Sequence, residues 1–270
     1  MGPVGDAMDT YFDLGGYSFP VTTQSTEAQT WFDRGILWTY GYNHEEAVKC
    51  FGRAIDADPK CAMAHWGAGY ASGPNYNMPW DLFDSAGRAA AARAGYAHAR
   101  KALDLIDGAT EWEAALIQAL PARYAQPDPL DPEAMKAWDA DFADAMRDVF
   151  ASHSESHEVR TVFAESLLNL TPWKMWDLPS GQPAAHARTV EAQTVLEEAL
   201  VGNPSAIHHP GLLHLYIHLM EMSPFPERAL KAGDALRRLV PDAGHLIHMP
   251  THIDVPVSYT HLTLPTKRIV

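Results

Sequence analysis

The chain has 270 residues, of which 47% are hydrophobic and 20% are charged, and this composition is typical of a folded protein with a sizeable core. Its formal net charge of −14 at pH 7 repels phosphate backbones and anionic lipid, which excludes nucleic acid and membrane surfaces as partners. The two cysteines, Cys50 and Cys61, are too few for a disulfide framework, and the sequence has neither a signal-like start nor a membrane-length apolar run. We therefore expect a cytoplasmic protein.

The first predicted element is a helical hairpin between Ala28 and Pro59. Small and aromatic residues recur there at helical spacing before a closing proline, at Trp31, Gly35, Trp38, Ala47, Phe51, Ala54 and Pro59. This series resembles the tetratricopeptide repeat (TPR), a helical hairpin of about 34 residues. We expect the small residues Gly35 and Ala47 to let the two helices approach closely, while the aromatic side chains fill the space between them.

The middle third of the chain keeps a helical pattern with a weaker repeat signal. The segment Gly73–Trp80 (GPNYNMPW) interrupts the second hairpin before an alanine-rich helix near residues 85–105. Thr110 followed by Glu113 predicts a capping box, and Asp131 and Ser156 are expected to cap the next two helices. A loop rich in proline, glycine and tryptophan should follow at residues 171–183.

The repeat pattern returns after this loop. Residues typical of the second repeat helix recur in two consecutive series, which are Ala192, Leu196, Ala199 and Pro204, then Ala229, Gly233, Leu236 and Pro241. The sequence contains no alternating β-strand of useful length. We therefore predict an all-α fold in which residues 1–255 form a single right-handed superhelical solenoid of TPR-like hairpins.

The last residues have a different character. Val257–Thr266 (VSYTHLTLPT) resembles the translation of a widely used sequencing-adapter DNA. We therefore expect residues 256–270 to be an artificial tail, and the natural chain to continue differently after Val255 as part of a longer, here truncated, protein.

Two histidine pairs give the sharpest functional signal. His214 and His218 lie in HLYIH, and His248 and His252 lie in HMPTH, so that equivalent members are 34 residues apart. A spacing of four places both imidazoles of a pair on one face of a helix. Aligned on the TPR pattern, these residues and two others fall on positions that line the concave groove of such repeats, and the full set is His214, His218, Glu221, His245, His248 and His252.

Imidazole is the commonest metal ligand in proteins, and two such pairs, or one pair with Glu221, fill the ligand set of a divalent transition ion such as zinc or copper. Alternatively, the histidines bind a peptide or stack among aromatic rings without a metal. Pro250 lies inside the second pair and disfavours helical geometry at Met249. A helix that begins only at Pro250 would place His248 in a turn, and the two pairs would then not be equivalent.

Aromatic and amide side chains in the two irregular segments form a second group of candidates. We interpret them as walls of a ligand site, and the group comprises Tyr76, Asn77, Trp80, Trp173 and Trp176. The alternative interpretation is that the aromatic residues only fill the core between repeats.

The TPR resemblance implies a groove that binds a partner protein, a peptide or a small-molecule ligand. The segments HHPGLLHLYIHLMEMSP and AGHLIHMPTHID are, in addition, similar to a group of large histidine-rich bacterial TPR proteins. Our first hypothesis is a repeat scaffold whose groove also holds a divalent metal. The second is a metal-dependent hydrolase or oxidoreductase with Glu221 as acid and base, although Leu215 stands where an HExxH metalloprotease would carry its glutamate.

Overall fold

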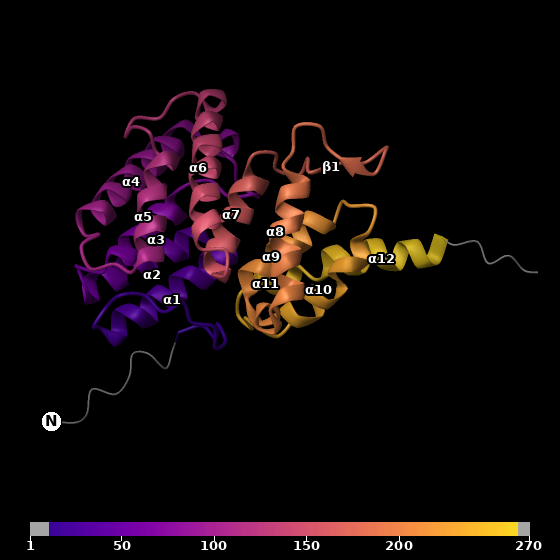
Figure 1. Cartoon of the computed structure of the whole chain (residues 1–270), viewed down its shortest axis with the longest axis horizontal. Helices are drawn as coiled ribbons and strands as arrows, with labels where there is room; N and C mark the ends of the chain where they lie inside the picture. Colours follow the sequence, from indigo (N-terminus) through magenta and orange to yellow (C-terminus); the bar gives the residue numbers. More distant parts are fainter. Residues whose placement is uncertain (1–10, 264–270) are drawn as a thin grey trace, which may run out of the picture.

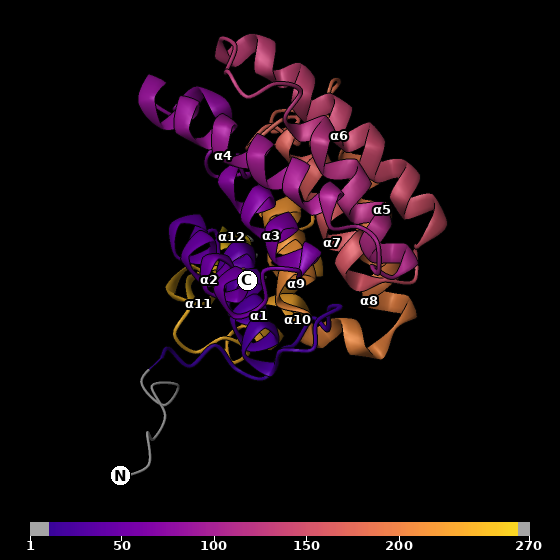
Figure 2. The same ribbon diagram turned by 90° about the vertical axis from the view of Figure 1, so that its left-hand side faces the viewer.

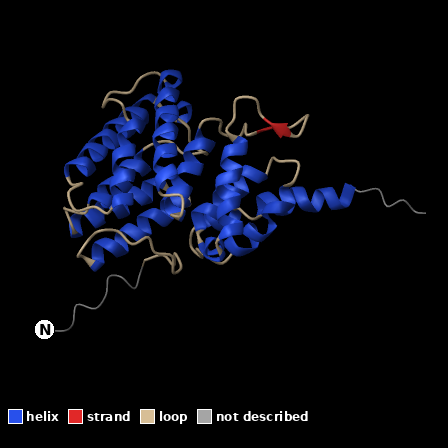
Figure 3. Ribbon diagram, viewed as in Figure 1, coloured by secondary structure: helices blue, strands red, loops and turns tan. Residues whose placement is uncertain are grey.

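A computed structural model describes residues 11–263, and within that range the only sheet has two short strands (Figure 1, Figure 3). The predicted all-α class is confirmed. Of the expected artificial tail, residues 264–270 lie outside the described part of the chain. No helix in the described part has the length and apolar character needed to cross a membrane.

Helical hairpins make up the first half of the chain. Its helices are α1 (Thr26–Tyr40), α2 (His44–Ala57), α3 (Ala62–Ser72), the 3-10 turn η1 (Trp80–Leu82), α4 (Ser85–Asp104), α5 (Glu111–Ala119), the 3-10 turn η2 (Leu120–Arg123), α6 (Pro132–Ser152) and α7 (His157–Asn169). The α1–α2, α2–α3 and α3–α4 pairs all pack together. Gly35 of α1 and Gly67 of α3 both lie against the Phe51 ring, where an added Cβ would approach ring atoms to 2.6 Å and 2.4 Å. The close approach expected at Gly35 is therefore present.

The helix starts in this half follow the predicted caps. Thr110 and Glu113 form the capping box at the start of α5. Asp131 accepts the Ala134 N–H at the start of α6, and Ser156 accepts the Val159 N–H at the start of α7. These side chains satisfy amide groups that have no partner within the helix itself.

The second half begins with the small hairpin of strands β1 (Trp176–Asp177) and β2 (Gln182–Pro183), which are antiparallel. The helices that follow are α8 (Thr189–Gly202), the 3-10 turn η3 (Pro204–His208), α9 (Pro210–Met220), the 3-10 turn η4 (Pro226–Ala229), α10 (Leu230–Leu236), α11 (Gly244–His248) and α12 (Thr251–Thr263). The helix is interrupted at Met249 and Pro250, between α11 and α12, because the proline disfavours a continuous helix.

Helix α9 lies at the centre of the packing. All of its residues are buried, and it contacts α7, α8, α10 and α12 as well as the distant α1 (Figure 1, Figure 2). In a linear solenoid each hairpin contacts only its neighbours in sequence. The contact between α9 and α1 therefore departs from that arrangement and brings the first hairpin up to the histidine-bearing helix.

The N-terminal strap, residues 11–24, closes this arrangement. The Asp242 N–H donates to the Asp13 carbonyl at 2.9 Å, which joins the strap to the segment before α11. Gly15 has a φ of +75°, and an added Cβ would stand 2.0 Å from the Leu239 carbonyl oxygen. Only glycine fits at this position. The strap thus fixes both ends of the described chain against each other.

Candidate metal centre

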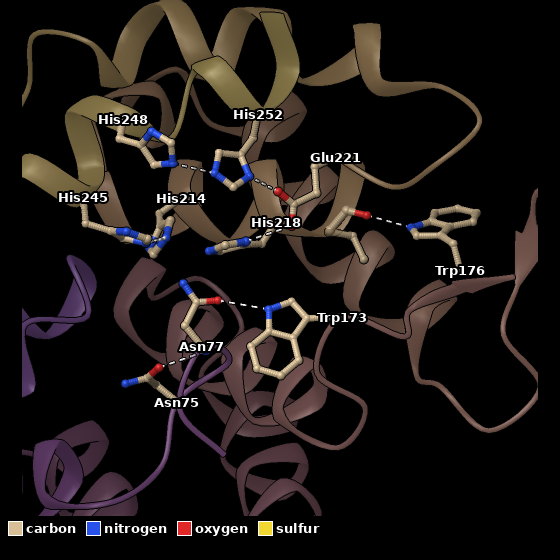
Figure 4. A network of polar contacts seen from close by, with 11 residues as sticks. Asn75, Asn77, Trp173, Trp176, His214, His218, Glu221, His245, His248 and His252 are labelled. Atoms are coloured by element: carbon tan, nitrogen blue, oxygen red, sulfur yellow. Dashed lines mark hydrogen bonds and ion pairs between the residues drawn. The ribbon is translucent and has the colours of Figure 1, made fainter. Parts of the chain in front are cut away.

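Helix α9 carries two buried histidines one turn apart. His214 and His218 are 1% and 2% exposed. Helix α11 brings His245 to the same place, and its Nε2 lies 3.1 Å from the Nε2 of His214 (Figure 4). One nitrogen from each of the three imidazoles can be chosen so that all lie within 4.8 Å of one another. This histidine triad, His214, His218 and His245, is close enough to hold a metal ion.

One atom of the triad is left without a partner by the fold. The Nε2 of His218 is buried and has no hydrogen-bond partner among residues 11–263. A buried polar atom without a partner costs free energy unless another group satisfies it. A tetrahedral ion bound at about 2.0–2.1 Å to each imidazole nitrogen would hold those nitrogens about 3.4 Å apart. The Nε2 atoms of His214 and His245 are 3.1 Å apart, and a nitrogen of His218 lies within 4.8 Å of both rings, so an ion between them would satisfy the unpaired nitrogen of His218.

Glu221, the first residue after α9, orients two of the histidines. Its Oε1 lies 3.0 Å from Nδ1 of His218, and its Oε2 accepts a hydrogen bond from Nδ1 of His252 (Figure 4). Each Nδ1–H is thereby engaged, which leaves the Nε2 of each ring to face away from the carboxylate. A carboxylate behind an imidazole is the usual way in which proteins fix the ring of a metal-binding histidine.

The two histidine pairs predicted from the sequence are not equivalent. Because α11 ends at His248, the second pair spans a helix break, and His245 rather than His248 joins the triad. His248 instead lies with its Nε2 2.8 Å from the Nε2 of His252. The interruption expected at Pro250 is present, but His248 ends α11 instead of lying in a turn, and the next helix begins at Thr251.

Two tyrosines cover the triad. The Tyr42 ring centroid lies 4.5 Å from that of His214, 5.8 Å from that of His218 and 5.5 Å from that of His245. Tyr42 has a φ of 54° in the tight turn between α1 and α2, and this turn presents its ring to the histidines. Tyr76, from the inserted segment, lies 4.7 Å from the His218 ring.

Burial keeps the triad neutral. It lowers the pKa of His214, and the neighbouring His218 and His245 lower it further. Burial also lowers the pKa of His245, to about 4, with His218 as an added cause. The pKa of His218 is lowered by burial as well, although Glu221 opposes this. A neutral imidazole has the free lone pair that a metal ion requires.

The carboxylate beside the triad remains ionised. Burial raises the pKa of Glu221, but hydrogen bonds from His218 and His252 outweigh it and bring the pKa down to about 2. The hydrogen bond to Glu221 in turn raises the pKa of His252. Glu221 therefore supplies a fixed negative charge next to the triad, which favours a cation there.

The other predicted ligand residues occupy different places. Trp173 donates its indole N–H to Oδ1 of Asn77 at 3.3 Å, so the loop and the inserted segment meet at this pair (Figure 4). Trp176 donates to the Leu219 carbonyl at 2.6 Å and so holds the loop on α9. Trp80 is only 1% exposed and packs on Phe83, which agrees with the core alternative for this residue.

A groove beside the triad has a volume of about 1270 Å³. His245 and Tyr42 line it at the histidine end, and Asn75 and Asn77 of the inserted segment line it further along. Apolar side chains from α1, α2 and α4 form much of the remaining wall. The groove therefore reaches the triad at His245, whereas the buried His214 and His218 do not line it.

The sequence did not point to Tyr42. Its contact with all three imidazoles depends on the packing of α1 against α9, which are far apart in the chain. The tight YGYNH turn, in which a non-glycine residue takes positive φ, is the only local signal.

Compared with known proteins, the chain matches no family model, no curated protein and no solved structure.

Proposed function

We propose that this chain is a TPR-like scaffold that binds a divalent transition metal through His214, His218 and His245, and that it presents the ion to a peptide or small ligand in the adjoining groove. The observation that carries the proposal is the buried, unpaired Nε2 of His218, in a ring that has a nitrogen within 4.8 Å of nitrogens of His214 and His245. The two cysteines are free thiols, which supports a reducing, cytoplasmic location.

The packing of the first hairpins supports the TPR relationship. Phe51 of α2 lies between Gly35 of α1 and Gly67 of α3, so that the same ring fills the space within one hairpin and between that hairpin and the next. This sharing of one side chain by successive helices is the packing that a stacked repeat requires. The closing contact of α9 with α1 is then a feature of this chain added to the repeat pattern.

Three imidazoles without a fourth protein ligand leave a coordination position open. Such a centre suits zinc, and copper binds nitrogen ligands still more tightly under the Irving–Williams order. A carboxylate, imidazole or thiolate of a ligand in the groove would complete the coordination. The metal would therefore contribute directly to the affinity of the groove for its partner.

The decisive experiment is metal analysis and calorimetry of the purified chain. We expect zinc or copper to bind with one-to-one stoichiometry, and His214→Ala to abolish this binding while helicity by circular dichroism is retained. The matched control is His98→Ala, because His98 and His65 form another close pair, with Nδ1 atoms 3.2 Å apart, that has no third ligand among residues 11–263. An absence of bound zinc and copper, or equal binding by the His214→Ala chain, would refute the proposal.

The enzyme hypothesis gains nothing from the position of Glu221. Both of its carboxylate oxygens are engaged by histidine Nδ1 atoms, so it orients rings and is not free to act as a general base.

A further inference from the structure

A second cavity lies where the inserted segment, α6 and the 171–183 loop meet. It has a volume of about 310 Å³, which is at the lower end of the range for small-molecule sites. Trp80 and Trp173 both line it. The histidine triad does not, so this cavity is distinct from the candidate metal centre.

Two buried polar side chains line this cavity without partners. Asn169, the last residue of α7, is 6% exposed, and neither its Oδ1 nor its Nδ2 has a hydrogen-bond partner in the described part of the chain. Asp139 of α6 is 8% exposed, and its Oδ1 has no partner within hydrogen-bond distance in the same part of the chain, although the Trp80 indole, whose Nε1 is also unpaired, is near enough to lower the pKa of Asp139. Each such atom is costly to bury, and a cluster of them on one cavity wall is the pattern of a site that a ligand completes.

The charges around the cavity balance. Two aspartates, Asp81 and Asp139, and two lysines, Lys136 and Lys174, line it. Lys136 is also paired with Glu133. Burial raises the pKa of Asp139 to about 7, against the opposing effects of Arg123 and the Trp80 indole. A carboxyl group that is about half protonated at pH 7 can both donate and accept hydrogen bonds. With the Glu133 partner of Lys136 counted, the groups around the cavity then carry little net charge.

The unpaired atoms in the cavity would be satisfied by a ligand that carries both hydrogen-bond donors and acceptors. Asn169 offers one donor and one acceptor side by side, and Asp139 offers an acceptor. Neighbouring hydroxyl groups satisfy all three, because each hydroxyl both donates and accepts. The indole of Trp173, which is 42% exposed, provides an apolar surface for the C–H face of such a molecule.

We propose that this cavity binds a small uncharged polyhydroxy compound of the size of a monosaccharide, held by Asn169 and Asp139 and covered by Trp173. The site is independent of the metal centre, and its occupancy does not require the proposed function.

Saturation-transfer NMR of the whole chain with glucose, mannose, galactose and xylose tests the proposal, with glucosamine and glucuronate as charged comparators. We expect at least one neutral sugar to bind, the charged analogue of the same ring to bind more weakly, and EDTA to change nothing. If none of the neutral sugars binds, the cavity holds only water and the proposal fails. If only the charged compounds bind, the assignment to a neutral ligand is wrong.

Two variants locate the binding. Asn169→Leu should weaken it by at least about tenfold, because a buried donor and acceptor are lost together. Trp173→Ala, at a half-exposed position, should also weaken it. Leu178→Ala removes an exposed side chain of the same loop that lines a different cavity, and it is the control. Unchanged sugar affinity in the folded Trp173→Ala chain, or an equal loss in Leu178→Ala, would overturn the proposal.

Discussion

The buried histidines at the two ends of helix α9 differ in the hydrogen bonding of their ring nitrogens. At the N-terminal end, His209 is 2% exposed, its Nδ1 accepts the Leu212 N–H at 3.2 Å, and its Nε2 lies 3.0 Å from the Tyr17 hydroxyl. At the other end, His218 is equally buried, but its Nε2 has no partner among the residues described. The fold thus completes the hydrogen bonding of His209 and leaves that of His218 open.

Burial by itself therefore does not identify a metal ligand. Burial lowers the pKa of His209 to about 4, and it lowers the pKa of His245 in the triad to about 4 as well. What separates His209 from His218 is the pairing of the ring nitrogens, because the chain engages both nitrogens of His209 and only the Nδ1 of His218. A structural histidine has both nitrogens satisfied by the chain, whereas a ligand keeps one lone pair for the ion.

The largest expected effect concerns His218, at the C-terminal end of α9, where the Nε2 is unpaired. Metal should stabilise the parent chain by about 4 kcal/mol at a thousandfold excess over Kd. His218→Gln should lose this increment, because one of three ligands is gone, while the melting temperature without metal changes little. The measurement is thermal unfolding with zinc and with EDTA, and a His209→Gln chain that keeps the increment serves as the control. An increment that survives in His218→Gln would move the metal elsewhere.

The next largest effect is expected at His209, at the N-terminal end of α9, where both ring nitrogens have partners. His209→Ala removes the N-cap of α9 and the contact with Tyr17, and we expect it to lower the free energy of unfolding by about 2–3 kcal/mol. Denaturant unfolding in EDTA measures this loss. The folded variant should still bind one metal ion. A loss of metal with no loss of stability would show that the roles of the two ends are reversed.

A smaller effect on metal affinity is expected at Glu221, which orients histidine rings and does not itself bind the metal. Glu221→Gln keeps the size of the side chain but accepts poorly from two Nδ1–H groups, so metal affinity should fall about 10–100-fold without loss of stoichiometry. Calorimetric titration gives the affinity. Glu197→Gln is the matched control, since Glu197 accepts from Tyr216 on α9 and lies outside the triad. Equal affinities in the parent and Glu221→Gln chains would remove the orienting role.

The last expected effect concerns the pH dependence of stability. The folded pKa of His209, about 4, is below its unfolded value of about 6.5, so between these values the unfolded chain binds more protons. Its contribution makes stability fall as pH drops from about 6.5 to 4. His209→Asn keeps a capping acceptor and should make this slope shallower by about 1.4 kcal/mol per pH unit. Denaturant unfolding across this range in EDTA measures the slope, with the exposed His208→Asn as control. A slope equal to that of the parent would contradict the assignment.

Local features of this chain are readable from its sequence. The caps at Thr110, Asp131 and Ser156 depend on residues within one helical turn, and each forms as predicted. The break at Pro250 is likewise a local consequence of proline geometry. The all-α class follows from helical periodicity over the whole chain.

The composition of the site needs the tertiary structure. The 34-residue repeat period pairs His214 with His248, but in the structure His245 joins His214. The choice between the two depends on how the short helix α11 is oriented against α9. Tyr42 reaches the triad only because α1 packs on α9. Asn169 and Asp139 belong to different helices, and neither has a motif that would single it out.

The strap has a consequence for biosynthesis. Asp13 bonds to Asp242, which is 229 positions later in the chain. At about 5–20 residues per second, a ribosome needs roughly 10–50 s to add those residues. The first hairpin can therefore form early with part of the strap on it, since Phe19 and Val21 donate to Asp33 and Gln29 of α1, but the bonds of Asp13 must wait until the segment before α11 has emerged. Completion of the histidine triad, which needs His245 from the same late segment, belongs to this final step.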